Sequence, residues 1–186
     1  MHALTRRKLT YDDFLRFPDD GRRHELIDGA HYVTPSPNIA HQRVSFRLTM
    51  ALGSSLQGRG EVFAAPLDVL LSDHDIVEPD LLVVLREQAP HILTDQHVVG
   101  PPAIVIEIAS PGTRRRDQGI KRRLYERAGV REYWQVNPAS RVITVLVRAD
   151  GGFAPPVVLA EGDTLKTPLI PALDLDVRAL FAPVAG

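Results

Sequence analysis

The feature that most constrains the fold of this sequence is a pair of apolar runs, each of which carries one carboxylate. Asp80 opens the run Leu81–Leu85, and Glu107 lies near the end of the run Ile104–Ile108. Runs of this length and composition predict strands that are buried on both faces. A lone ionised carboxylate in such a strand is costly unless it is paired or bound to a metal. We therefore expect both acids at neighbouring strand ends, holding a divalent metal, with Lys121 close by. The alternative is that each acid only caps its strand or pairs with an arginine.

The remaining pattern predicts a mixed α/β sandwich around one sheet. Asp28-Gly29 between two short apolar segments indicates a β-hairpin. Helical spacing of apolar residues indicates a long helix that follows this hairpin. The expected helices cover residues 10–15, 39–57, 114–128 and 177–181, and the expected strands cover 25–27, 31–34, 61–72, 80–85, 103–109, 132–136, 142–148 and 153–159.

Composition narrows the class of protein. The 186 residues fit one domain of ordinary size, so we expect a single domain over 1–186. No cysteine is present, which excludes disulfides, zinc–thiolate clusters and thiol catalysis. The seven histidines lack a zinc-motif spacing. Since neither a signal core nor a membrane-length apolar run is found, we expect a cytoplasmic protein without a membrane partner.

The charge is unevenly distributed along the chain. The net charge is −1, which argues against a dedicated nucleic-acid coat protein. Between residues 114 and 131, however, eight Lys or Arg face only two acids, a surplus of six positive charges. Such a segment can neutralise phosphates, and Arg115, Arg116 and Arg122 are its candidate nucleic-acid contacts. The alternative is a solvated helix face.

The helix expected after the second apolar run carries the candidate lysine. If its buried face is centred on Ile120 and Leu124, Lys121 lies at the rim of that face and reaches over the strand end. A lysine there can stabilise charge that develops on a phosphate, or orient the attacking water. Tyr125, one turn later, can hold the lysine or a phosphate. The alternative is a surface ion pair between Lys121 and Asp117.

Taken together, the motifs of this chain resemble the Uma-type restriction endonuclease family of the PD-(D/E)XK nuclease superfamily. The resemblance covers about Thr10 to Phe181, in order and with natural spacing. It is carried by Glu25–Gly29, His41–Val44, Val77–Val83, Val105–Pro111, Arg116-Asp117, Lys121, Tyr125 and Gly129–Trp134. It implies an α/β, restriction-endonuclease-like mixed β-sheet flanked by helices, with an N-terminal β-hairpin and C-terminal antiparallel strands.

The resemblance also assigns roles to the central residues. Asp80 corresponds to the metal-binding aspartate of the superfamily, and Glu107 to its second acid. The usual lysine lies two residues after that acid, but Ala109 stands there in this chain. The resemblance places the lysine on the following helix, at Lys121. The implied activity is magnesium- or manganese-dependent hydrolysis of nucleic-acid phosphodiesters.

Two further residues match the family's N-terminal motifs. Glu25 resembles its additional acid, which either ligates or supports the metal, or is solvated at a strand edge. His41 resembles its motif histidine, which orients a water or touches phosphate, or else only caps its helix. The expected partner is nucleic acid, with DNA favoured, and a homodimer would suit the cleavage of two strands. The alternative function is a catalytically inactive module that binds nucleic acid or protein.

Overall fold

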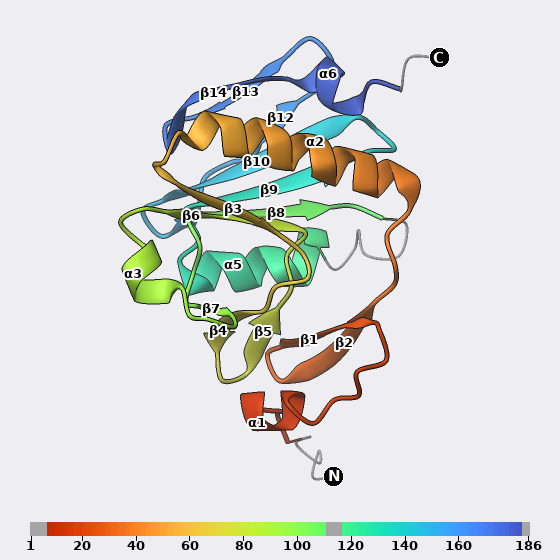
Figure 1. The fold of residues 1–186 in the computed structure, drawn as a ribbon, viewed down its shortest axis with the longest axis vertical. Helices are drawn as coiled ribbons and strands as arrows, with labels where there is room; N and C mark the ends of the chain where they lie inside the picture. Colours follow the sequence, from red (N-terminus) through yellow and green to blue (C-terminus); the bar gives the residue numbers. More distant parts are fainter. Residues whose placement is uncertain (1–6, 111–116, 184–186) are drawn as a thin grey trace.

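The computed structural model describes residues 7–110 and 117–183 (Figure 1). Its helices are α1 (Tyr11–Phe14), α2 (Ile39–Leu56), α3 (Ala89–Ile92), the π-helical turn η1 (Asp117–Lys121), α5 (Arg122–Ala128) and α6 (Val177–Phe181). Its strands are β1 (Arg23–Ile27), β2 (Ala30–Thr34), β3 (Gly60–Ala64), β4 (Val69–Ser72), β5 (Asp75–Val77), β6 (Leu81–Leu85), β7 (Val98–Val99), β8 (Ile104–Ile108), β9 (Glu132–Asn137), β10 (Val142–Ala149), β11 (Gly152–Phe153), β12 (Val157–Leu159), β13 (Thr164–Thr167) and β14 (Ile170–Asp176).

A seven-stranded mixed sheet forms the centre of the fold. Its order is β11-β10-β9-β8-β6-β3, and β12 also pairs with β10. β8 and β9 are parallel, and the connection between them contains η1 and α5. The other pairs of this sheet are antiparallel. The expected fold class, a mixed sheet flanked by helices with an N-terminal hairpin and C-terminal antiparallel strands, is confirmed.

The expectation of one sheet is wrong, because a second sheet has the order β2-β1-β5-β4-β7. The segment 61–72, expected as one strand, is two strands, β3 and β4, which belong to different sheets. Pro66 lies between them and has no backbone N–H for a ladder. The expected strand 153–159 is divided for the same reason, since Pro155 and Pro156 separate β11 from β12.

The two faces of the seven-stranded sheet bury two separate cores. Residues 81, 83 and 85 of β6 pack in the same core as the buried side of α2, whereas residues 82 and 84 pack with α5. β8 follows the same alternation, with Ile104 and Ile106 toward α2 and Val105 toward α5. Figure 1 shows α2 and α5 on opposite faces of this sheet. Side chains alternate between the two faces along a strand, so the even-numbered residues of β6 and the odd-numbered residues of β8 face α5.

Local signals in the sequence form the expected turns and caps. Thr10 caps α1 in a complete capping box with Asp13. Asp28 and Gly29 have φ angles of 53° and 72° and join β1 to β2, the geometry of a tight hairpin turn. The long helix ends at Leu56, where Gln57 adopts a left-handed conformation. Among the described residues, no helix combines the length and the apolar character needed to cross a bilayer.

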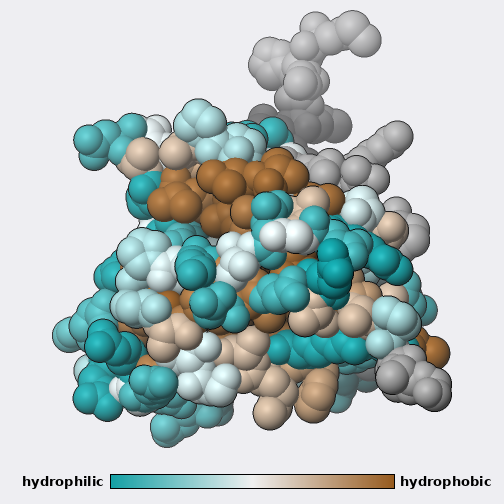
Figure 2. All heavy atoms as spheres, turned by 90° about the horizontal axis from the view of Figure 1, so that it is seen from above, coloured by the Kyte–Doolittle hydropathy of each residue, from teal (hydrophilic) through white to brown (hydrophobic). Residues whose placement is uncertain are grey.

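Helix α2 is apolar on two sides. Its inner side supplies buried leucines and a valine to the core, and its outer side carries exposed large apolar residues. The inner residues are Val44, Leu48, Leu52 and Leu56, and the outer residues are Ile39, Phe46 and Met50. Apolar side chains also gather into one patch, bordered by polar ones, on the face of the molecule shown in Figure 2.

Candidate active site

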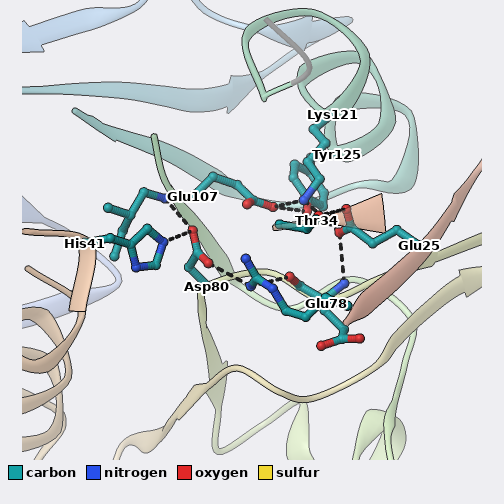
Figure 3. Close-up of polar contacts among 10 residues, drawn as sticks. Glu25, Thr34, His41, Glu78, Asp80, Glu107, Lys121 and Tyr125 are labelled. Carbon is teal, nitrogen blue, oxygen red and sulfur yellow. Dashed lines mark hydrogen bonds and ion pairs between the residues drawn. The ribbon is translucent and has the colours of Figure 1, made fainter. Parts of the chain in front are cut away.

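Asp80 and Glu107 meet at one end of the paired strands β6 and β8. Leu81 lies opposite Ile106 in this antiparallel pair, so the positions one step outward belong to Asp80 and Glu107. Both acids share the parity of the residues that face α5. The N–H of Ile108 donates to Oδ2 of Asp80 at 2.7 Å. The expectation that the two acids lie on neighbouring strands is confirmed (Figure 3).

Asp80 is held by donors from three elements. Arg23 of β1 approaches its Oδ1 at 2.8 Å, and Nε2 of His41 lies 3.0 Å from its Oδ2. Burial opposes ionisation of this carboxyl, but His41, Arg23 and the N–H of Ile108 together outweigh it and lower its pKa to about 2. Asp80 is therefore ionised at neutral pH although only 4% of it is exposed.

Lys121 joins the two sheets through a pair of buried carboxylates. Its ammonium lies 2.8 Å from Oε1 of Glu107 and 2.7 Å from Oε1 of Glu25. The Tyr125 hydroxyl donates to Oε1 of Glu107 at 2.6 Å. Lys121 thus points to the acids, as expected, but the expected rim position is wrong. Only 2% of the residue is exposed, because η1 and α5 turn Lys121, Leu124 and Tyr125 toward the sheets.

Glu25 is a buried member of this cluster. β1 is an internal strand of its sheet, between β2 and β5, and Glu25 is 1% exposed. Its Oε1 accepts the N–H of Glu78 at 3.1 Å, and its Oε2 accepts the hydroxyl of Thr34 at 3.3 Å. The reading of Glu25 as a solvated strand-edge residue is therefore wrong.

His41 contacts Asp80 and is not the helix cap. Asn38 caps α2 by accepting the N–H of His41 at 2.9 Å. With the Nε2 of His41 on Asp80, its Nδ1 is buried and has no hydrogen-bond partner among the described residues. The catalytic roles of both Glu25 and His41 stay predictions.

Sequence reasoning missed two residues of the cluster, Arg23 and Glu78. Arg23 is two positions from Glu25, so strand alternation places both on one face, and this signal was available in the sequence. Glu78 lies where the chain passes from β5 in one sheet to β6 in the other. Its Oε2 is buried without a partner in the described structure. Burial, reinforced by the nearby charge of Asp68, raises the pKa of Glu78 to about 7.

The residues expected to contact nucleic acid do not form one surface in the described structure. Tyr125 is fully buried and bound to Glu107, so the expected surface contact of this side chain with nucleic acid is wrong. Arg115 and Arg116 lie outside the described residues. Arg122 is half-buried at the start of α5, beside Lys121. Its contact with nucleic acid stays a prediction.

The donor chemistry of the cluster fits a divalent cation. Magnesium prefers oxygen ligands and is usually held by one or two carboxylates together with water or substrate oxygens. In the described part of the chain, no three His, Asp or Glu side chains already form a metal-binding group. Within the cluster, four carboxyls face two permanent cations, and when Glu78 is ionised one dication balances the two surplus negative charges. The carboxyls are Glu25, Glu78, Asp80 and Glu107, and the cations are Arg23 and Lys121.

A solvent-accessible pocket leads to these acids. It has a volume of about 390 Å³ and lies between the residues after α1, the β2–α2 connection and the first turns of α2. A narrower recess behind it reaches Glu107 and Lys121. The pocket and the recess share walls formed by Arg23, Thr34, Pro35, Pro37, His41 and Asp80. Asp80 is therefore accessible from the pocket, and Glu107 lines only the recess.

Comparison with known families identifies the family of this chain. The model of the Uma2 family, described as "Putative restriction endonuclease", matches residues 11–178. The chain belongs to the Uma2 family. All the site residues named above fall within the matched range. The resemblance inferred from the motifs is confirmed, and the family description supports a nuclease.

Two relatives extend this result. A solved structure described as a "putative nuclease belonging to DUF820" from Anabaena variabilis superposes with a TM-score of 0.79 and 20% identity. The match covers 93% of this chain and 97% of that one, so the Uma2 chain and the Anabaena protein share a fold. The "Uncharacterized protein slr1290" of Synechocystis is 26% identical over 149 residues, which cover 78% of this chain and 77% of the relative.

Proposed function

We propose that this Uma2 protein is a magnesium- or manganese-dependent endonuclease that hydrolyses nucleic-acid phosphodiester bonds. One observation carries the proposal. Asp80 and Glu107 converge from adjacent strands onto one face of the sheet and line a narrow recess that shares Asp80 with the larger pocket, with the ammonium of Lys121 bound to Glu107. Buried carboxylates beside a cation are typical of functional sites.

Each residue of the cluster has a role in this proposal. Asp80 and Glu107 would hold the ion, and the chemistry supplied there is polarisation of the phosphodiester and activation of a water. The low pKa of Asp80 keeps this ligand ionised at neutral pH. Lys121 stabilises negative charge that develops on the phosphate. Glu25 holds Lys121 in place from the second sheet, and His41 fixes the orientation of the Asp80 carboxylate.

The finer features of the proposal concern substrate and assembly. We propose DNA as the substrate and a homodimer as the assembly in which both strands of a duplex would be cut. We also propose that the chain acts as one restriction-endonuclease-like domain, because the cluster draws residues from β1 through α5.

The proposal is tested by metal binding and cleavage in Asp80→Asn and Glu107→Gln. We expect the parent protein to bind Mn²⁺ in a calorimetric titration and to cleave plasmid or single-stranded DNA, and both variants to lose both properties. Asp75→Asn is the matched control, because Asp75 is also buried and ion-paired, but with Arg127, outside the cluster. It should lose stability and keep metal binding. A parent without metal binding and without cleavage of DNA or RNA would contradict the proposal.

A second candidate function is a catalytically inactive module that binds nucleic acid or protein on the same scaffold. It is favoured by the donors that already occupy both oxygens of Asp80, namely Arg23, His41 and the N–H of Ile108. In that case these donors would permanently occupy the place of a metal on Asp80. The same titration separates the two candidates, since the module binds its partner equally well in EDTA.

A further inference from the structure

The pocket beside Asp80 has the size and the walls of a ligand site. Its volume of about 390 Å³ falls in the range of about 300–1,000 Å³ that is typical of small-molecule sites. Its lining comes from five segments that come together only in the folded chain, within residues 19–23, 34–37, 41–45, 65–66 and 78–80. Asp80 lies in both the pocket and the recess behind it. A group bound in the pocket is therefore next to the proposed reaction centre.

The lining suits a flat heterocycle with polar edges. Pro35, Pro37 and Pro66 supply rigid apolar walls. Gln42 and Ser45, from the same side of α2, supply hydrogen-bond donors and acceptors. Arg22 adds an exposed guanidinium at the rim, a group that binds phosphate and stacks on bases. The carboxyl residues Asp19, Glu78 and Asp80 also line the pocket. Proteins hold an extruded nucleobase by such a combination of apolar walls and polar groups.

We propose that this pocket receives one unpaired nucleobase of the substrate, adjacent to the phosphodiester at Asp80. The inference rests on the proposed function, because it takes the substrate to be nucleic acid. A base in a duplex is stacked and paired, and it enters such a pocket only after the strand opens. The protein therefore binds a duplex more tightly where it is locally unpaired at the cleavage site, and Gln42 reads the edge of the base.

The test compares a base-bearing and a base-free ligand of equal charge. Binding of a short oligothymidylate and of an abasic phosphodiester chain of the same length is measured by fluorescence anisotropy in EDTA, so that no cleavage occurs. The parent should bind the oligothymidylate about tenfold more tightly than the abasic chain, the size expected for one held base. Equal affinity for the two ligands would overturn the proposal.

Filling the pocket should remove this difference. Ser45→Phe places a ring in the pocket and should lower the affinity for oligothymidylate to that of the abasic chain. Ser54→Phe is the matched control, because Ser54 is exposed on the same helix and does not line the pocket. It should leave the tenfold preference unchanged. A folded Ser45→Phe protein that retains the preference would overturn the proposal.

A second variant covers the case in which Ser45→Phe does not fold. Gln42 is exposed, so Gln42→Ala should fold normally. It should change the rank order of affinities for oligomers of the four bases and leave the abasic chain unaffected. An unchanged rank order would overturn the proposal. A separate cleavage assay distinguishes the proposed function from the proposed pocket. Base preference without cleavage would contradict only the endonuclease activity. Cleavage without base preference would contradict only the binding of a base in the pocket.

Discussion

Lys121 is buried between two carboxylates that belong to different sheets, Glu25 of β1 and Glu107 of β8. A buried charge of this kind is tolerated only when it is paired, and removal of one partner leaves the others uncompensated. The residue therefore has two effects, one on the stability of the cluster and one on the chemistry proposed for it. The two can be measured separately.

Replacing Lys121 by Met should affect both properties. We expect the free energy of unfolding to fall by about 3 kcal/mol in EDTA, because Glu25 and Glu107 lose their shared partner. Divalent metal should restore part of this loss, since the nearby positive charge that opposed a cation is gone. Cleavage should fall by about a hundredfold or more. Chemical denaturation with and without Mg²⁺, and a plasmid-cleavage assay, measure these effects.

The control for this variant is Lys166→Met. Lys166 is exposed and pairs with Asp174 at 3.4 Å on the surface. Its loss should cost less than about 1 kcal/mol and leave cleavage unchanged. Full cleavage by Lys121→Met would contradict the assignment of the lysine to the helix.

Glu78 gives the stability of the protein a specific pH dependence. Its pKa in the folded protein is raised from 4.5 to about 7, chiefly by burial. Between these two values the folded state binds more protons at this site than the unfolded state does. The contribution of Glu78 to stability is therefore greatest below pH 4.5 and is lost as the pH rises to about 7.

The variant Glu78→Gln isolates this effect. Its free energy of unfolding, relative to that of the parent, should rise progressively as the pH is raised from about 4.5 to about 7. The reason is that only the parent has to ionise a carboxyl whose charged form is disfavoured by burial. Urea denaturation at a series of pH values measures the difference. Glu61→Gln, at an exposed position of β3, is the control. A parent-minus-variant difference that does not change with pH would show that Glu78 ionises as freely as an exposed acid.

At the scale of elements, the β1–β2 hairpin delivers three side chains to the site. Arg23 and Glu25 of β1 and Thr34 of β2 lie on its inner face. The turn that joins the strands is packed against the N-terminal segment. Gly29 accepts a hydrogen bond from Leu9 through its carbonyl at 3.0 Å, and Lys8 forms an ion pair with Asp28. The conformation of this turn therefore affects the position of the strands that carry Arg23, Glu25 and Thr34 into the site.

Gly29→Ala should destabilise the hairpin. The residue has a φ of 72°, and an added Cβ would lie 2.8 Å from the Cα of Lys8, so both strain and a clash with backbone result. We expect a loss of about 3 kcal/mol in thermal or chemical unfolding. Gly21→Ala is the matched control, because Gly21 also has a φ of 72° but has open space around its Cα. It should lose only about 1–2 kcal/mol. Equal losses would show that packing against Lys8 contributes nothing.

At the scale of the whole molecule, positive charge is concentrated in the segment 114–131, which contains α5. The chain is nearly neutral, yet residues 114–131 carry a surplus of six positive charges. α5 lies on the opposite face of the seven-stranded sheet from α2 and α6 (Figure 1). The described basic residues of this segment lie in and after α5, on the side of the sheet that also supplies Lys121, and would attract a polyanion there.

Neutralising Arg115 and Arg122 together should weaken nucleic-acid binding and flatten its salt dependence. Each phosphate contact that is lost should lower the slope of log K against log[salt] by about 0.9 for duplex DNA. Fluorescence anisotropy across a salt series measures the slope, and circular dichroism checks the fold. Arg178→Gln is the control, since Arg178 is exposed on α6 and pairs with Glu161. An unchanged slope in the double variant would identify the basic segment as a solvated face.

Local chemistry in the sequence determined several parts of this protein. The Asp28-Gly29 turn, the helix from Ile39, the short helix Val177–Phe181 and the buried strands after Asp80 and before Ala109 all form as their residues predict. They depend on backbone preferences and on the period of apolar residues, which act over a few positions. The position of Asp80 beside Glu107 followed from the same patterns, because each of the two neighbouring buried strands carries one acid at its end.

The tertiary structure determined the features that are formed by segments far apart in the sequence. The second sheet, the burial of Glu25 and the contact of Arg23 with Asp80 depend on how the chain crosses between sheets at residues 65–68 and 78–80. Lys121 and Tyr125 face the acids because η1 and α5 turn them inward. The pocket exists only where five separate segments meet. No local pattern specifies such contacts, since their free energy comes from packing between elements that are far apart in the sequence.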